Sequence, residues 1–422
     1  MSDTIYALSS GGPPAAIAVI RISGPGAEAA VKALTGTLPQ PRRATLVKVR
    51  HDGEEIDRAL ALRFPGPESA TGEDIAELHL HGGRAVVRAV LSALGAVEGL
   101  REAEPGEFTR RAFLNGRIDL AEAEGLADLL SAETEAQRRA AHAMAGGALS
   151  RQIDAWREAI LSLAADVEAM LDFADEADVG EGAAERWPGR ARGLAAEMAE
   201  MLERPPAERL RDGVRVAIAG PPNAGKSSLL NAIAQREAAI TSPVPGTTRD
   251  LIEAPVAIAG IPFLLTDTAG LRESPDAIER VGIARARAAM DAADIILWLG
   301  MPADAPPGAM RIHPKSDLAL PRAGADFAVS AVTGEGLADL ARLLVDRARA
   351  LLPREGEVAL HSRHRTLVAA CKDALQEAAS AQDALIAAEA LRSARMALDR
   401  VTGRAGVEEM LDALFGRFCI GK

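Results

Sequence analysis

Apolar and polar residues alternate over short stretches in the first quarter of the chain, a pattern that predicts β-strands. Four stretches have this pattern: residues 17–22, 46–49, 59–64 and 75–81. A helical pattern follows at residues 85–94, and turns rich in glycine and proline, such as residues 65–67, separate the segments. Strands and helices in this mixed order predict an α+β domain over residues 1–117.

From about residue 118 the apolar residues recur every three or four positions, as on the buried face of a helix. Six of them define one long helix: Ile153, Trp156, Ile160, Leu163, Val167 and Met170. The same spacing returns further along the chain at Leu367, Cys371 and Leu375. We therefore expect a helical-bundle domain, residues 118–210 and 353–422, interrupted by an inserted domain at residues 211–352. Two separate helical domains are the alternative.

The inserted segment opens with an alternating apolar stretch at residues 214–218, which predicts a buried strand. Gly220 and Gly225 then bracket four residues before Lys226 and Ser227, matching the phosphate-binding pattern G-x-x-x-x-G-K-[ST]. The amides of such a loop and the start of the next helix attract phosphates. Lys226 is expected to reach the outer phosphates and Ser227 to hold Mg²⁺. The expected GTP contacts here are Asn223, Ala224, Gly225, Lys226, Ser227 and Ser228.

Two further motifs follow in the order that a Ras-like P-loop GTPase requires. The polar loop at residues 245–250 offers Thr247 and Thr248 to the nucleotide; Thr248 can complete the Mg²⁺ shell, and Arg249 is a candidate catalytic residue. The next motif reads Asp267, Thr268, Ala269 and Gly270. Asp267 would hold the metal, and the Gly270 amide would sense the γ-phosphate.

A variant of the guanine-binding motif N-K-x-D predicts how the base is recognised. Lys315 and Asp317 match the last positions of N-K-x-D, in which the aspartate accepts two hydrogen bonds from guanine and the lysine stem covers the base. Pro314 stands where that motif has asparagine, so one orienting contact is missing. Ser330 and Ala331 fit the final base-contact loop. We expect GTP rather than ATP, and Pro314 leaves the strength of binding open.

The catalytic water also needs an unusual partner. Leu271 follows Gly270, where Ras-like proteins place the glutamine that orients water, and leucine cannot do so. Glu279, in the predicted helix that follows, is the candidate replacement. A solvated helix carboxylate is the alternative interpretation of Glu279.

Composition narrows the class of protein without changing this picture. The 422 residues contain neither an apolar run long enough to span a bilayer nor a basic segment followed by an apolar one at the start. Two distant cysteines fit a reducing compartment, so we expect a cytoplasmic protein without a membrane partner. The net charge of −12 argues against broad coating of nucleic acid but permits a local basic site.

Several motifs outside the inserted segment are specific in combination: Ile20-Arg21-Ile22-Ser23-Gly24, Thr71-Gly72-Glu73-Asp74, Pro105-Gly106-Glu107-Phe108-Thr109, Arg111-Ala112-Phe113-Leu114-Asn115-Gly116 and Phe418-Cys419-Ile420-Gly421-Lys422. Together with the order of segments they resemble the MnmE, or TrmE, family of tRNA-modifying GTPases. The resemblance covers nearly the whole chain.

The resemblance implies a homodimer that joins the flavoprotein MnmG (GidA) in a heterotetramer and acts on tRNA. The reaction would add an aminomethyl or carboxymethylaminomethyl group at C5 of the wobble uridine, U34. The one-carbon unit would come from 5-formyl- or methylene-tetrahydrofolate. The N-terminal domain would bind the folate and drive dimerisation, and the matching positions are Arg21, Glu77, Arg117 and Lys422.

The resemblance also supplies a K⁺ ion in place of an arginine finger, between GTPase domains that pair face to face. Asn223 matches the family's K⁺-coordinating asparagine, and the carbonyls of Ser242, Val244 and Thr247 lie in the loop that would complete the shell. Glu279 matches the glutamate that positions the attacking water through a bridging water.

Three groups of residues have two interpretations each. Cys419 is either a nucleophile that adds to uridine C6 or a buried structural thiol. His79 and His81 are either metal ligands or satisfied polar strand positions, and the second is favoured because no third ligand stands out. Residues 361–365 either contact tRNA phosphates or begin a solvated helix.

For the function of the whole chain, there are two alternatives. One is a GTP-dependent assembly or ribosome-associated switch without folate chemistry. The other is a scaffold that binds nucleotide without turnover.

Overall fold

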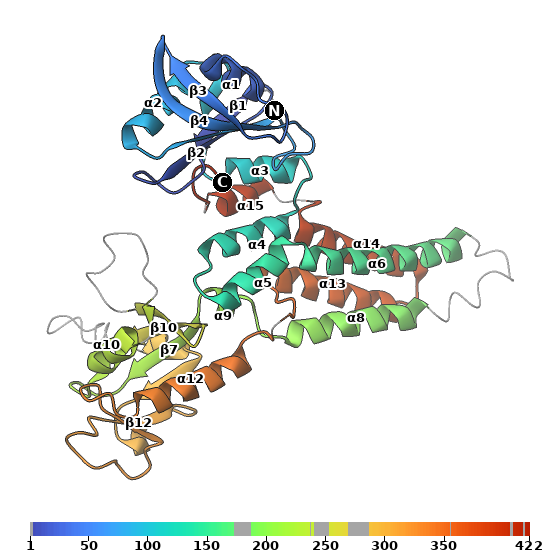
Figure 1. The fold of residues 1–422 in the computed structure, drawn as a ribbon. Helices are drawn as coiled ribbons and strands as arrows, with labels where there is room; N and C mark the ends of the chain where they lie inside the picture. The colour runs from blue at the N-terminus through green and yellow to red at the C-terminus, as the bar shows by residue number, and fades with distance from the viewer. Residues whose placement is uncertain are drawn as a thin grey trace, which may run out of the picture. The chain divides into compact units, whose positions relative to one another are not determined.

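A computed structural model describes residues 3–172, 187–236, 238–239, 253–268, 287–354, 356–405, 408–416 and 418–422 (Figure 1). The chain divides into two compact units. The first unit comprises Met1–Ala127 and Asp399–Lys422, and the second comprises Asp128–Leu398. No helix among the described residues is both long enough and apolar enough to cross a membrane.

The first unit is built on a six-stranded sheet of order β3-β4-β5-β2-β1-β6. Its strands are β1 (Thr4–Leu8), β2 (Ile17–Ser23), β3 (Thr45–His51), β4 (Glu54–Phe64), β5 (Ile75–His81) and β6 (Leu100–Glu102). All neighbours pair antiparallel except β1 and β6, which are parallel. The four predicted strands are confirmed, whereas β1 and β6 were not predicted. Helices α1 (Ala27–Thr35) and α2 (Arg84–Gly95) bury their apolar residues against one face of the sheet.

The C-terminal residues complete this first unit. Helix α15 (Glu408–Phe415) packs against α3 (Glu107–Leu114), and Phe415 and Phe418 share an apolar core with Leu120. The Ser9 hydroxyl donates to the Gly421 carbonyl at 2.8 Å. Gly421 has φ +96°, and a Cβ there would lie 2.1 Å from the Leu8 carbonyl oxygen, so only glycine fits. The sequence pattern had grouped this segment with the helical bundle.

The second unit contains one helical bundle formed from both sides of the inserted segment. Its helices are α4 (Leu120–Ser131), α5 (Glu135–Ala145), α6 (Ala148–Asp172), α8 (Trp187–Glu203), α13 (Ser362–Ser380) and α14 (Ala384–Thr402), of which α4 and α14 continue into the first unit. Helix α13 packs along α8, and α8 packs along α6 (Figure 1). Helices from both sides of the inserted segment therefore pack against one another in this unit. The predicted face of α6 is buried from Ile153 to Val167, while Met170 is half-buried.

The inserted segment forms an α/β module on a seven-stranded sheet of order β13-β12-β11-β7-β10-β9-β8. Its elements are α9 (Glu208–Arg211), β7 (Val214–Ala219), α10 (Lys226–Arg236), β8 (Ala238–Ala239), β9 (Glu253–Ile258), β10 (Ile261–Asp267), β11 (Ile295–Trp298), a 3₁₀ turn (Pro302–Asp304), β12 (Met310–Pro314), β13 (Phe327–Val329) and α12 (Leu337–Leu351). Strand β9 pairs antiparallel with both neighbours, and the other pairs are parallel. The carboxyl ends of the parallel strands meet at one edge, where ligands bind in open α/β sheets.

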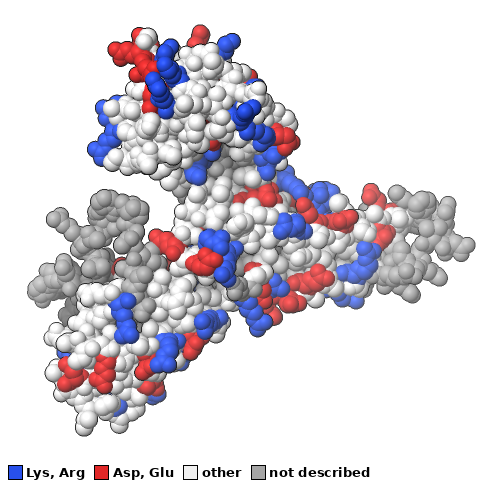
Figure 2. All heavy atoms as spheres, viewed as in Figure 1, with Lys and Arg blue, Asp and Glu red and all other residues white. Residues whose placement is uncertain are grey.

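Charged side chains of both signs are interspersed on the face shown in Figure 2. This mixture agrees with the modest excess of acidic residues behind the net charge of −12. Any anionic partner approaching this face therefore meets local clusters of charge and not a broad basic surface.

Candidate functional site

The loop between β7 and α10 has the backbone conformation of a phosphate cradle. Gly220, Asn223 and Gly225 have positive φ values of 144°, 60° and 96°. A Cβ on Gly220 would lie 3.1 Å from the Gly300 nitrogen, so both the backbone angle and the space require glycine there. Asparagine tolerates the left-handed region better than most residues, which suits Asn223 to the turn.

Lys226 and Ser227 begin α10, directly behind this loop. The Lys226 ammonium donates to the carbonyls of Gly220 at 3.0 Å and Pro221 at 2.8 Å, and the residue is only 5% exposed. The Ser227 hydroxyl donates to the Asp267 carboxylate, which β10 delivers beside β7. Two of the three predicted Mg²⁺ ligands, Ser227 and Asp267, are thus in contact. A hydroxyl and a buried carboxylate are oxygen ligands of the kind Mg²⁺ prefers, so the residues present fit the ion.

Thr268, the next residue of that motif, is held through its side chain. Its hydroxyl donates to the Ile218 carbonyl at 3.0 Å, which joins the end of β10 to β7. The other predicted residues of the γ-phosphate region and the K⁺ loop lie outside the described residues: Ser242, Val244, Thr247, Thr248, Arg249, Ala269, Gly270 and Glu279.

The predicted base-contact residues occupy two loops at the ends of β12 and β13. The Lys315 ammonium donates to the Asn223 carbonyl at 3.0 Å, so the base loop reaches the phosphate loop. Ser330 is fully buried, and its hydroxyl accepts from the amides of Val332 and Thr333 at 3.3 and 3.1 Å. Asp317 is exposed in the turn after Lys315, as a carboxylate that must receive a base should be.

In the first unit, two of the four predicted folate residues are in direct contact. Arg21 on β2 lies opposite Glu77 on β5, and its Nε and Nη2 atoms lie 3.0 and 2.8 Å from Glu77 Oε1. The other Glu77 oxygen lies 3.1 Å from His79 Nε2. Burial raises the pKa of Glu77, but the hydrogen bond with His79 and the charge of Arg21 outweigh it, so that the pKa falls below its usual value. Glu77 is therefore ionised at neutral pH.

The other two predicted folate residues have different partners. Arg117 Nη2 lies 3.7 Å from Glu68 Oε2, and the Lys422 amide donates to the Cys419 carbonyl at 3.2 Å. Cys419 is exposed, so its interpretation as a buried structural thiol is wrong. The buried cysteine is Cys371, and burial raises the pKa of its thiol to about 12.

The histidines on β5 are satisfied polar strand positions. His79 pairs with Glu77, and His81 Nδ1 lies 2.7 Å from Asp57 Oδ1. Within the described ranges, no group of three or more histidine, cysteine or acidic side chains is placed to hold a metal ion. The metal interpretation therefore finds no support in these two histidines.

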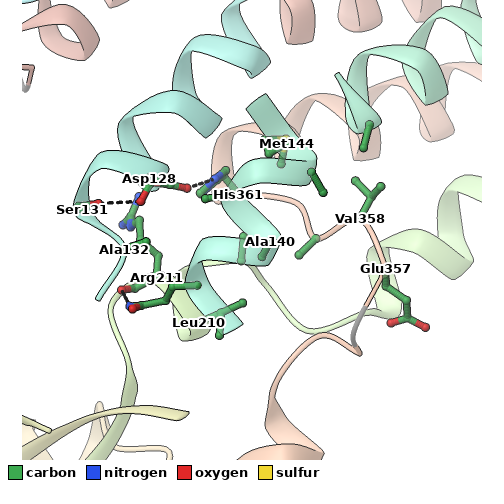
Figure 3. A pocket seen from close by; sticks show the side chains of 16 residues that line it. Asp128, Ser131, Ala132, Ala140, Met144, Leu210, Arg211, Glu357, Val358 and His361 are labelled. Atoms are coloured by element: carbon green, nitrogen blue, oxygen red, sulfur yellow. Dashed lines mark hydrogen bonds and ion pairs between the residues drawn. The ribbon is translucent and has the colours of Figure 1, made fainter. Parts of the chain in front are cut away.

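The segment at residues 361–365 begins a helix, as one of the two interpretations predicted, but two of its side chains are not solvated. Helix α13 starts at Ser362, and both His361 and His364 are buried. His361 points toward Asp128 (Figure 3), and its Nε2 lies 3.0 Å from Asp128 Oδ2. No pattern along the chain indicated this pair.

His361 and Asp128 line a cavity where the two connectors of the inserted module meet the bundle (Figure 3). The connectors are tied together, because the Ala207 amide donates to the Leu360 carbonyl at 3.1 Å. Gln137 of α5 donates to the Arg211 carbonyl at 2.8 Å. Three segments distant in sequence supply these groups, so no local pattern could reveal them.

A phosphate loop, an acidic strand end beside it and two base loops on the same sheet edge define the class of protein: a P-loop GTPase. Two family models identify its parts. The model for the MnmE helical domain matches residues 120–419, and that for the GTP-binding protein TrmE N-terminus matches residues 4–117. The chain belongs to the MnmE family of tRNA modification GTPases.

Full-length relatives agree. The tRNA modification GTPase MnmE of Erythrobacter litoralis (strain HTCC2594) is 58% identical over 424 residues, covering 100% of both chains. Its counterpart in Rhizorhabdus wittichii is 60% identical over 430 residues, covering 100% of this chain and 97% of that protein. Among solved structures, the G domain of the T. maritima FeoB iron transporter is 25% identical over 32% of this chain and 98% of that chain, with a TM-score of 0.23, a likeness too distant to bear on function.

Proposed function

We propose that this GTPase works with the flavoprotein MnmG to install aminomethyl or carboxymethylaminomethyl groups at C5 of U34 in certain tRNAs, using a one-carbon unit from tetrahydrofolate. K⁺ would stimulate its hydrolysis of GTP. The observation that carries the folate part of the proposal is the contact of Arg21 with Glu77. The family gives these two positions to the folate site, and they come from different strands.

For GTP, each half of the nucleotide has a residue suited to it. Lys226 would exchange its two carbonyl partners for the outer phosphate oxygens. Ser227 and Asp267 would hold Mg²⁺, which supplies positive charge to the phosphate oxygens. Asp317 would accept the guanine N1–H and N2–H groups, and the Lys315 stem would cover the base.

For folate, too, each end of the ligand has a residue of suitable charge. The Arg21 guanidinium suits a carboxylate of the glutamate tail, and the ionised Glu77 suits the pterin ring nitrogen and amino group. Binding must share or replace the ion pair between them, because each group now satisfies the other. Arg117 and Lys422 complete the proposed set, and exposed Cys419 remains the candidate nucleophile toward uridine.

For K⁺, the proposal rests on Asn223 and the loop carbonyls of Ser242, Val244 and Thr247, with Glu279 positioning water and Arg249 as a further catalytic candidate. Pairing of two nucleotide modules would make the active form a homodimer, joined by MnmG in a heterotetramer in the cytoplasm. We propose the domain boundaries 1–117, 118–210, 211–352 and 353–422, with residues 399–422 packing into the first unit.

The first experiment measures GTP turnover with Mg²⁺ in KCl and in NaCl at equal ionic strength. We expect strong stimulation by K⁺ alone and its loss in Asn223→Ala, with Asn115→Ala in the first unit as the matched control. Equal rates in both salts would refute the cation site. A second experiment, equilibrium dialysis with 5-formyl-tetrahydrofolate, separates this proposal from a switch without folate chemistry, which would show no binding.

A further inference from the structure

Pro314 removes one support of the guanine-reading turn. It is the last residue of β12, opposite Val329 of β13, and it is buried. Proline has neither a backbone N–H nor a polar side chain, so it cannot supply the orienting contact of the usual asparagine. The turn that carries Asp317 begins directly after it and must be held by other groups.

His313, the residue before Pro314, lies beneath that turn. It is 3% exposed, and its Nε2 atom lies 3.2 Å from the carbonyl oxygen of Ala319. A carbonyl only accepts, so Nε2 must carry the hydrogen. The Nδ1 atom is buried without a hydrogen-bond partner among the described residues. The only N–H of the neutral imidazole therefore donates to the arm of the turn that follows Asp317.

The near arm is held from β13. The Ser316 amide donates to the Val329 carbonyl at 3.1 Å, and the Leu318 amide closes the turn on the Lys315 carbonyl at 3.0 Å. Asp317 stands between these two anchored arms. A further hydrogen bond, from the Ser316 hydroxyl to Glu335 at 3.0 Å, lies on the surface, where water competes.

We propose that His313 is a positioning residue for guanine recognition and replaces the support that the missing asparagine would give. Its hydrogen bond to Ala319 fixes the arm of the turn that follows Asp317. A carboxylate reads N1–H and the 2-amino group together only when both its oxygens are aimed, because a paired contact depends on orientation. The hydrogen bonds that hold Lys226 in the phosphate loop, to the Gly220 and Pro221 carbonyls, do not involve His313. His313 should therefore govern selectivity for the base and leave phosphate binding unchanged.

The test compares the dissociation constants of GDP, inosine diphosphate and pyrophosphate for the full chain with Mg²⁺. Inosine lacks the 2-amino group, so the ratio of the first two constants reports how well Asp317 is aimed. We expect His313→Leu to weaken the binding of GDP about tenfold, since the arm of the turn after Asp317 loses its buried hydrogen-bond donor. The substitution should weaken the binding of inosine diphosphate less and leave the binding of pyrophosphate unchanged. His313→Gln, whose amide can donate at a similar reach, is the matched control and should keep the ratio near that of the unaltered chain.

An unchanged ratio in folded His313→Leu would overturn the proposal, and so would an equal loss for pyrophosphate. If His313→Leu does not fold, long-range ¹H–¹⁵N spectra of the unaltered, histidine-labelled chain decide. When GDP is bound, the His313 Nε2–H should exchange with solvent more slowly, and pyrophosphate should not have this effect. An exchange rate that GDP does not change would refute the role. The inference rests on the nucleotide site itself. Failure of the unaltered chain to bind GDP would count against that site and is distinguishable from a lost ratio.

Discussion

The nucleotide site and the Arg21–Glu77 pair show two ways of assembling charged groups. In the nucleotide site, Lys226 and Ser227 are adjacent in sequence, and one neighbouring strand delivers Asp267. In the first unit, Arg21 and Glu77 are 56 residues apart and meet only because β2 and β5 pair in one register. A phosphate site is a local property of the backbone, whereas a paired-residue site depends on how the sheet is aligned.

The two sites also differ in how their positive charges are satisfied. Lys226 donates to neutral carbonyls, so moving its ammonium to a phosphate breaks no ion pair and costs little electrostatic free energy. Arg21 is already paired with an ionised carboxylate. The nucleotide site should therefore respond strongly to the loss of the Lys226 charge, and the proposed folate site should respond less to the loss of the Arg21 charge.

The largest effect is expected for Lys226→Ala. The lysine charge lies where negative charge develops on the outer phosphates, and removing such a group costs about 100-fold or more in turnover. GTP hydrolysis at saturating substrate measures it, with exposed Lys48→Ala as the control. Turnover within threefold of the unaltered chain would show that Lys226 does not act on the phosphates.

Arg21→Ala should weaken the binding of 5-formyl-tetrahydrofolate about tenfold, because one charge-assisted hydrogen bond to the ligand is lost. GTP turnover should not change, which distinguishes the two sites. Arg58→Ala, on the same sheet and exposed, is the matched control. A folate dissociation constant unchanged by Arg21→Ala would remove this residue from the proposed site.

Acid should destabilise the first unit through its buried ion network. Burial raises the pKa of Glu107, but hydrogen bonds from Arg101, from the Glu104 amide and from Arg111 lower it more, so that it lies below 4.5. A carboxyl whose pKa is lower in the folded state adds stability above pH 4.5 and loses it as the pH falls through the folded value. Thermal unfolding of the first unit between pH 6 and pH 3 tests this. Glu107→Gln should flatten the dependence, and exposed Glu104→Gln should not.

The smallest effect is expected for Thr134→Ala, which touches neither site. Thr134 caps α5 in a capping box with Gln137, and losing such a cap costs about 1 kcal/mol of the free energy of unfolding. Denaturant unfolding measures it. Thr366→Ala, at an exposed position on α13, should change stability by less than about 0.5 kcal/mol. Loss of GTP turnover in folded Thr134→Ala would show that the connector contact of Gln137 reaches the nucleotide site.

What could be predicted from the sequence follows from this contrast. The phosphate loop, the Asp267 strand end and the long helix of Ile153 depend on spacing within a few residues, so patterns sufficed. Strand β6 has three residues, which are too few to show an alternating apolar and polar pattern. The pairing of His361 with Asp128 requires the bundle to form first. At the base loop, Pro314 indicated a lost contact, while the compensating bond of His313 became visible only in three dimensions.

The packing of Phe415 and Gly421 into the first unit also sets an order of events during synthesis. A ribosome makes the strands of that unit early, but the residues that close its core against Leu120 follow only after residues 128–398. Until then, the Ser9 hydroxyl lacks its Gly421 acceptor, and Phe113 of α3 lacks the Phe415 ring that packs against it. The sheet can thus form at once, while its completed surface exists only after the whole GTPase module has been translated. Incomplete chains would lack a finished first unit, whatever the state of their nucleotide site.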